Sequence, residues 1–287
     1  MNNPIPLIVI TGTTASGKTS LAIQVAQHCN GEIICADSRT VYRGMDIGTA
    51  KPSFQERKLV KHHLLNVVNP DQVFTVFDFK QRADALIKDI MSRGKTPILV
   101  GGSGLYIDAV VYNYKFRPVN EKNRRKYEHA SIEELQNYLI ARKISLPENS
   151  RNKRYLLRLV ETGQEPPNQH HLRDNTYIFG LFVSPAEQKE RSHRRLEVMI
   201  KQGLIEEVRT LRKKYALTLP SMQAPAYKAF RTYIEKECTL EEAKELCLQY
   251  EAQLAKKQRT WFKRNKSIQW YDDPGKIVEL STTLLNT

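Results

Sequence analysis

The sequence predicts an α/β protein with a P-loop-type parallel sheet, helices on both faces of that sheet, and a mainly helical insertion. Short apolar segments alternate with helical periodicity over the first third of the chain, as in parallel sheets. The apolar segment 6–11 runs into GTTASGKT at 12–19, the G-x-x-x-x-G-K-[ST] pattern of a phosphate-binding loop, or P-loop. Because residues 115–175 contain no apolar strand, we expect 1–114 and 176–287 to form the core and 115–175 the insertion.

The core elements follow from their composition. Short apolar runs bounded by glycine or proline predict buried strands, and apolar residues spaced along one face predict helices. We expect strands at 6–11, 31–38, 96–106 and 176–184, with a last short strand at 267–273. We expect helices at 18–28, 77–95, 185–203, 204–215, 227–236 and 239–265, whereas 55–66 fits either a helix or a strand.

The insertion is expected to bind a polyanion. Its helix at 131–143 begins with the capping-box pair Ser131 and Glu134, and its helix at 151–163 ends at Gly163. The whole chain has a net charge of +14 and a pI of about 9.6, which fits either a polyanion partner or a solvated basic surface. The basic residues are dense in the insertion, and this placement favours a polyanion partner. The candidate contacts to a phosphate backbone are Arg124, Arg154 and Arg158.

The sequence also argues against a membrane span, a signal peptide, a cysteine-pair motif and a zinc site. No apolar run approaches the length of about 18 residues that a membrane span needs, and 5–11 fits a strand better than a signal peptide. None of the four cysteines forms a C-x-x-C pair, so we expect free thiols and a cytoplasmic protein. The adjacent histidines at 62–63 and 170–171 point to opposite sides of any regular element, which argues against a zinc site.

Three loops are expected to meet at the carboxyl ends of the strands, where ligands bind in such sheets. They are the P-loop, the Asp37–Ser38 turn and the Gly101–Gly104 turn. Asp37 is suited to act as a general base or to hold a magnesium-bound water, although it could simply cap its loop. Backbone N–H groups, the Lys18 charge and a Thr19-bound Mg²⁺ predict a diphosphate site formed by Gly12, Thr13, Thr14, Ala15, Ser16, Gly17, Lys18 and Thr19.

Five further patterns occur in order along nearly the whole chain. They are GTTASGKTSLA at 12–22, ADSRTVYRGMDIGTAKP at 36–52, HHLLNVVNP at 62–70, LVGGSGLYI at 99–107 and QRTWFKR at 258–264. In these segments the chain resembles the tRNA dimethylallyltransferase, or tRNA isopentenyltransferase, family. The YRGMDIGTAKP sequence is the most specific part of the resemblance.

The resemblance implies an enzyme that transfers a dimethylallyl group from dimethylallyl diphosphate to N6 of the adenosine 3′ of the anticodon in tRNA, giving N6-isopentenyladenosine. It implies that the P-loop and Arg191 hold the diphosphate, that Asp37 takes the N6 proton, and that Ser103 lies near the same centre. The implied partners are the donor and a tRNA anticodon stem-loop. We expect no membrane partner and, since nothing in the sequence suggests obligate assembly, a monomer. The implied tRNA contacts are Asp37, Ser38, Arg39, Thr40, Ser103, Arg124, Arg154 and Arg158.

Several positions depart from the family pattern. Thr13 replaces a proline, Ser103 replaces a threonine but keeps the hydroxyl, and Ala226 replaces a glycine. Thr40 replaces a glutamine, and its shorter side chain cannot bond bidentately to a base, so base selection is the property most affected.

Two other functions fit parts of the sequence. A kinase of a nucleoside or small metabolite would share the P-loop and the sheet, and it would turn over ATP. An RNA-binding module with a structural P-loop would bind tRNA without chemistry. The strand at 96–106 carries glycine where many ATPases carry aspartate, and the guanine-specifying N-K-x-D motif is absent, so neither nucleotide is specified.

Overall fold

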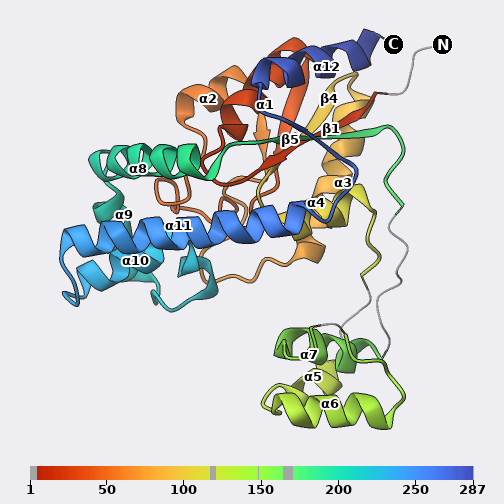
Figure 1. Cartoon of the computed structure of the whole chain (residues 1–287), viewed down its shortest axis with the longest axis vertical. Coiled ribbons are helices and arrows are strands. Elements are labelled where there is room, and N and C mark those ends of the chain that lie inside the picture. The colour runs from red at the N-terminus through yellow and green to blue at the C-terminus, as the bar shows by residue number, and fades with distance from the viewer. Residues whose placement is uncertain (1–4, 117–120, 148, 164–170, 287) are drawn as a thin grey trace. The chain divides into compact units, whose positions relative to one another are not determined.

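The computed structural model describes residues 5–116, 121–147, 149–163 and 171–286 (Figure 1). Its contacts divide the chain into two compact units, one of residues 1–112 and 172–287 and the other of residues 113–171. The first unit contains the sheet and the P-loop, and the second contains only helices among its described residues.

A six-stranded parallel sheet runs through the first unit in the order β3-β2-β4-β1-β5-β6. The predicted α/β class with a parallel sheet is therefore confirmed. The strands are β1 (Leu7–Gly12), β2 (Gly31–Cys35), β3 (His62–His63), β4 (Thr96–Gly101), β5 (Thr176–Leu181) and β6 (Ile268–Tyr271). The ambiguous segment 55–66 contains both kinds of element, since α2 (Phe54–Leu59) precedes β3.

The central strand β1 serves two cores because successive side chains point to opposite faces of a sheet. Leu7 and Val9 pack in the core that contains α3 (Val76–Ser92) and α4 (Gly104–Val111). Ile8 and Ile10 pack in a second core with α1 (Lys18–His28) and α12 (Pro274–Asn286). Helices therefore cover both faces, as the apolar strands predict, although α4 and α12 were not anticipated from the sequence.

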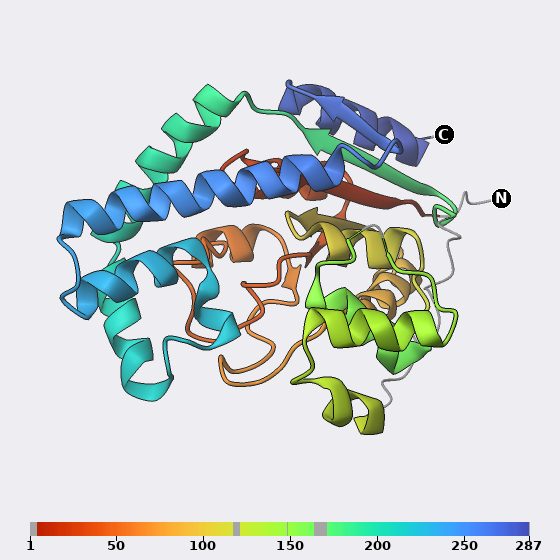
Figure 2. The same ribbon diagram turned by 60° about the horizontal axis from the view of Figure 1, so that its bottom comes forward.

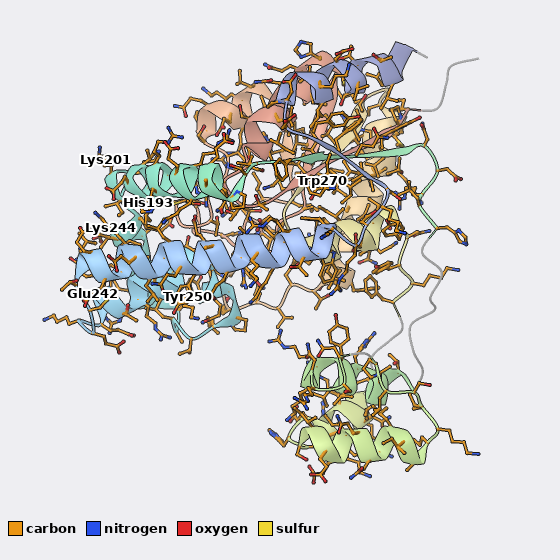
Figure 3. All side chains as sticks on the ribbon, viewed as in Figure 1. His193, Lys201, Glu242, Lys244, Tyr250 and Trp270 are labelled. Atoms are coloured by element: carbon orange, nitrogen blue, oxygen red, sulfur yellow. The ribbon has the colours of Figure 1, made fainter. Side chains whose placement is uncertain are left out.

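Four helices and a short 3₁₀ turn form a further cluster of the first unit. They are α8 (Pro185–Lys201), α9 (Leu204–Lys214), η1 (Pro220–Gln223), α10 (Pro225–Ile234) and α11 (Leu240–Phe262). Buried side chains from all of them share one apolar core. Figure 2 shows α11 running from this cluster to the sheet. Lys244, labelled in Figure 3, joins α11 to α8 through a 3.1 Å ion pair with Glu197.

The second unit consists of α5 (Glu121–Tyr127), α6 (Ile132–Ala141) and α7 (Lys153–Thr162). It has its own small core, built from Leu135, Leu139, Leu156, Leu159 and Val160. The Ser131–Glu134 capping box starts α6 as predicted, and Gly163 ends α7 with a left-handed φ of 70°.

A dense edge contact explains one glycine of the sheet. Trp270, labelled in Figure 3, lies on the edge strand β6 and covers Gly180 of β5. A Cβ added at Gly180 would lie 2.5 Å from the indole ring, so no larger residue fits there.

Among the described residues, none of the helices has the length and apolar composition that crossing a membrane requires.

The amino end of β2 carries a buried carboxylate surrounded by cations. Glu32, whose side chain is 2% exposed, accepts bonds from Arg93 (2.6 and 2.8 Å) and lies 3.0 Å from Lys95. His63 bonds to its other oxygen at 2.7 Å, so this histidine has a structural partner. The bonds from Arg93 lower the pKa of Glu32 far below its ordinary value, despite burial acting in the opposite direction.

We expect Glu32→Gln to lower the free energy of unfolding by roughly 2 kcal/mol at neutral pH, because it leaves partly buried cations without their counter-charge. The lowered pKa means that this contribution is fully present above the ordinary glutamate pKa of about 4.3, begins to decrease below it, and is lost only as the pH falls through the lowered pKa of the folded state. Urea unfolding of both proteins at pH values near 7 and 3 measures the difference. Glu241→Gln is the control, because Glu241 forms an exposed pair with Lys244, and it should change stability by less than about 0.5 kcal/mol.

Candidate active site

A pocket of about 410 Å³ lies at the carboxyl ends of β1, β2 and β4, within the first unit. The volume is in the range of small-molecule sites. Its walls come from the P-loop, from the loops after β2 and β4, and from α8 and α11. The residues that carry charge or hydrogen-bonding groups there include Thr14, Ser16, Lys18, Thr19, Asp37, Arg39, Thr40, Arg191, Arg195, Glu251 and Gln258.

The P-loop has the backbone shape of an anion-binding nest. Gly12 and Gly17 adopt φ values of 151° and 96°, which L side chains rarely adopt, and a Cβ on Gly12 would lie 2.7 Å from the carbonyl oxygen of Leu181. Helix α1 starts directly after the loop at Lys18. The buried hydroxyl of Ser16 has no hydrogen-bond partner among the described residues, so it is available to an anion.

Lys18 lies over the loop and donates to the carbonyl oxygen of Thr13 at 2.5 Å. Burial lowers the pKa of Lys18 to about 8, and the charge of Arg195 acts in the same direction, whereas Asp37 opposes it. A bound anion would restore the protonated form, because an opposite charge stabilises an ammonium group.

Two arginines one helical turn apart on α8 form hydrogen bonds to the P-loop. Arg191 donates to the Ser16 carbonyl oxygen at 2.7 Å and to Glu187 at 2.6 Å. Arg195 donates to the Thr14 hydroxyl at 2.9 Å and to Glu251 at 2.7 Å. Sequence analysis selected Arg191 and missed Arg195, although the four-residue spacing on one helix face was a usable signal.

The two loops that carry the predicted catalytic residues Asp37 and Ser103 are joined by a hydrogen bond between Ser38 and Ser103. The Asp37 Oδ1 atom accepts the backbone N–H of Arg39 at 2.7 Å, and its Oδ2 atom has no hydrogen-bond partner among the described residues. The Ser103 hydroxyl accepts the backbone N–H of Ser38 at 3.0 Å. Asp37 therefore caps its loop with one oxygen while the carboxylate also lines the pocket.

Gly101 explains why β4 lacks the aspartate of many ATPases. A Cβ at this position would lie 1.9 Å from the carbonyl oxygen of Ala36, so the backbones of β4 and the loop after β2 approach too closely for any side chain. The same approach allows the N–H of Ser103 to bond to Ala36 at 3.3 Å. This tip can therefore present Ser103, but it cannot present a carboxylate at 101.

The segment 42–52 is held by two charged side chains. Glu207 of α9 accepts the backbone N–H groups of Asp46, Ile47 and Gly48 at 2.8 to 2.9 Å, and the Tyr227 hydroxyl at 2.6 Å. A Cβ at Gly48 would lie 2.7 Å from the Tyr227 ring. Consecutive N–H groups that converge on one carboxylate fix the loop as it passes the pocket.

Lys51 fixes the same segment from within. Its side chain is 3% exposed, and its ammonium group donates to the Tyr42 carbonyl oxygen at 2.5 Å, to Asn66 at 2.6 Å and to Asp46 at 2.7 Å. The aspartate, the second glycine and the lysine of the YRGMDIGTAKP pattern thus have structural roles, since the Asp46 and Lys51 side chains pair and no side chain fits at Gly48.

Arg39 and Thr40, two further predicted tRNA contacts, follow Asp37 in the loop after β2 and differ in their exposure. Arg39 lies on the pocket wall and donates to the carbonyl oxygens of Pro220 and Ser221 in η1. Thr40 is only 6% exposed, and its hydroxyl faces the Asp37 carbonyl oxygen at 3.5 Å. This burial limits Thr40 to a small contact area for any ligand.

The candidate arginines of the insertion lie on helices of the second unit. Arg124 on α5 and Arg158 on α7 both pair with Glu161, at 3.7 and 3.1 Å. Arg154 is exposed in the first turn of α7. One carboxylate shared by two guanidinium groups leaves a net positive charge on these helices.

The residues of the pocket fit a Mg²⁺ ion that is bound by a few protein oxygens together with the phosphates of a substrate. Thr19 and Asp37 supply a hydroxyl and a carboxylate, the oxygen donors that Mg²⁺ prefers. Within the described part of the chain, no group of three or more His, Cys, Asp or Glu side chains could form an all-protein site. His62 bonds to the Val60 carbonyl oxygen, and His170 lies outside the described residues.

We expect the affinity for inorganic pyrophosphate to fall as the pH rises through about 8, because Lys18 attracts the anion only in its protonated form. The decrease should be roughly fivefold between about pH 8 and pH 9. Titration calorimetry of the wild type and Lys18→Gln measures it, and the ratio of the two affinities cancels the ionisation of pyrophosphate itself. Lys214→Gln, an exposed change on α9, should follow the wild type, whereas a constant ratio for Lys18→Gln would contradict this role.

Comparisons with known proteins identify the family. The model of the IPP transferase family matches residues 40–265. A tRNA dimethylallyltransferase of Macrococcus caseolyticus (strain JCSC5402) is 39% identical over 292 residues, which cover 96% of this chain and 94% of that protein. One of Bacillus pumilus (strain SAFR-032) is 39% identical over 285 residues, covering 93% and 89%.

Solved structures agree with these sequence matches. The full-length tRNA isopentenylpyrophosphate transferase from Bacillus halodurans superposes with a TM-score of 0.76 at 31% identity, covering 98% of this chain and 97% of that one. A eukaryotic dimethylallyltransferase acting on tRNA gives a TM-score of 0.79 at 26% identity, covering 93% and 73%. The resemblance in the sequence motifs is thereby confirmed, and the chain belongs to the IPP transferase family.

Proposed function

We propose that the chain transfers a dimethylallyl group from dimethylallyl diphosphate to N6 of the adenosine 3′ of the anticodon in tRNA. The observation that carries the proposal is that one pocket contains both an anion-binding loop with three flanking cations and the carboxylate of Asp37. The tRNA dimethylallyltransferases that the chain resembles support the same reaction and argue against a kinase.

The donor's diphosphate is proposed to lie in the P-loop. The P-loop N–H groups that are not bonded within the protein, together with Lys18, Arg191 and Arg195, face the negative charge that builds up on the departing pyrophosphate; the Thr14 N–H is already bonded to Gln258. These groups stabilise the transition state more than the ground state, because the leaving group gains charge as its C–O bond breaks. Mg²⁺ held by the Thr19 hydroxyl would supply further neutralisation of that charge.

The acceptor side is proposed to be formed by Asp37 and Ser103. The exocyclic amine of adenine is a weak nucleophile, so a base that removes its proton speeds the attack. The Asp37 Oδ2 atom, which has no hydrogen-bond partner among the described residues, is the group that accepts this proton. The Ser103 hydroxyl accepts the N–H of Ser38, the residue after Asp37, and is proposed to help to orient the amine.

A base inside an anticodon loop reaches such a pocket only when it leaves its stack. Arg154 is proposed to contact the phosphate backbone of the tRNA and so to stabilise the displaced loop. Arg124 and Arg158, which each also pair with Glu161, are proposed to make further contacts of this kind. Salt-dependent contacts of this kind position the RNA without reading its sequence.

The proposed reaction is tested by offering the protein unmodified tRNA with Mg²⁺ and either labelled dimethylallyl diphosphate or labelled ATP. We expect label in the tRNA from dimethylallyl diphosphate only, and nuclease digestion should yield N6-isopentenyladenosine. A phosphorylated nucleoside or metabolite formed from ATP would instead establish the kinase function. Binding of tRNA with no transfer from either donor would support the RNA-binding module.

The role of Asp37 gives a second prediction. Asp37→Asn removes the proton acceptor but keeps an oxygen for the N–H of Arg39, so the loop should remain folded. We expect the single-turnover rate of transfer to fall by roughly 10²- to 10⁴-fold, with the dissociation constant for tRNA changed less than about threefold. Asp71→Asn, at an exposed position, should transfer at the wild-type rate. Loss of tRNA binding in Asp37→Asn would assign this residue to recognition and not to catalysis.

A further inference from the structure

A buried amide on α11 joins two of the loops that form the pocket. The Gln258 side chain accepts the backbone N–H of Thr14 at 2.7 Å through Oε1 and donates from Nε2 to the Gly102 carbonyl oxygen at 3.0 Å. The residue is 8% exposed. One side chain therefore satisfies a donor of the P-loop and an acceptor of the loop that carries Ser103.

Neighbouring contacts of α11 hold this amide in place. Glu251 lies seven residues earlier, on the same face of the helix, and bonds to Arg195 at 2.7 Å. Trp261 follows in the next turn, donates from Nε1 to Asp108 at 2.7 Å, and lies 2.2 Å from where a Cβ on Gly104 would be. The helix is thus fixed to α8 and α4 on either side of Gln258, so the amide has little freedom to move.

The amide also continues a chain of contacts toward the proposed base. Gly102 precedes Ser103, whose hydroxyl accepts the N–H of Ser38, and Ser38 follows Asp37. Because every link is a hydrogen bond or a peptide bond, a shift of the Gln258 amide changes the position of the P-loop relative to Ser103 and Asp37. The Thr11 hydroxyl, one residue before the P-loop, also donates to the Gly101 carbonyl oxygen at 3.3 Å, so Gln258 adds to a link that the paired strands β1 and β4 already make.

We propose that Gln258 is a positioning residue that sets the distance between the donor loop and the acceptor loop of the transferase. The inference rests on the function proposed above. Reacting atoms must lie about 3 to 3.5 Å apart, and a displacement of about 1 Å reduces the rate by about 100-fold. Gln258 touches neither substrate in this scheme, so its loss affects the rate of transfer and leaves the affinity for pyrophosphate nearly unchanged.

Gly102 provides an independent way to displace the same amide. A Cβ at Gly102 would lie 2.3 Å from the Gln258 Nε2 atom, and the next nearest atom outside this side chain is the Gly12 carbonyl oxygen at 3.7 Å. The φ of Gly102 lies outside the left-handed range, so alanine is compatible with its backbone. Gly102→Ala is therefore expected to act mainly by moving the Gln258 amide.

The test is a double-mutant cycle of Gln258→Met, Gly102→Ala and the combined variant, with Gln253→Met as the control on the exposed face of α11. Methionine matches the length of glutamine and removes both hydrogen bonds. Single-turnover transfer from dimethylallyl diphosphate to unmodified tRNA, pyrophosphate binding by calorimetry and the melting temperature are measured for each protein. Gln258→Glu is added because it keeps the acceptor for Thr14 and loses the donor to Gly102.

Each single variant is expected to transfer roughly 30- to 100-fold more slowly, with pyrophosphate affinity within about threefold of the wild type. The combined variant should be no slower than the slower single variant, because both changes break one contact. Gln258→Glu should lie between the wild type and Gln258→Met, and Gln253→Met should match the wild type. Normal transfer by Gln258→Met, multiplied losses in the combined variant, or parallel losses of rate, pyrophosphate binding and melting temperature would overturn the inference. A wild type that transfers no label would instead refute the proposed function.

Discussion

The close approach of the backbones at the carboxyl ends of β2 and β4 is the constraint on which the site depends. Gly101 and Ala36 come so near that a Cβ on Gly101 would lie 1.9 Å from the Ala36 oxygen. The two following loops are consequently within hydrogen-bond reach, and Ser103 contacts Ser38 directly. A parallel sheet brings its strand ends to one edge, but only this lack of a side chain brings the two loops together.

Charge balance is the second constraint, since a site for a diphosphate must hold cations together before the ligand arrives. The structure does so by giving each cation a partner: Arg191 has Glu187, Arg195 has Glu251, and Lys18 has a carbonyl oxygen. The exposed carboxylate of Glu187 and the buried carboxylate of Glu251 keep the two guanidinium groups beside the loop against their mutual repulsion. The site is therefore organised in advance, and little rearrangement is needed when the anion binds.

Sequence reasoning predicted the parts of the candidate site that depend on local pattern. The P-loop, Asp37 and Ser103 follow strands, and strand ends can be located from apolar runs. It could not assign a role to Gln258, which lies 156 residues from Gly102, or to Glu251, whose partner Arg195 is on another helix, because helical periodicity gives only the face and not the partner. Arg195 was missed for a similar reason, although its spacing from Arg191 placed both on one face. The short strand β3 and helices α4 and α12 were also not separable from loops, since two-residue strands and short helices depend on tertiary contacts.

The long helix α11 shows why a distant segment takes part in the site. A helix of 23 residues extends about 34 Å, which is enough to begin in the helical cluster and end at the sheet. Its amino-terminal half packs in that cluster through Ala243 and Cys247, and its carboxyl-terminal half packs against the sheet through Phe262. A helix packed into both cores holds the Gln258 side chain, four residues before its carboxyl end, more firmly than a loop could, because the backbone that carries it cannot move independently of those cores. The pairing of β1 with β4 brings the two strand ends side by side, and α11 adds a side chain that bonds to both of the loops that follow them.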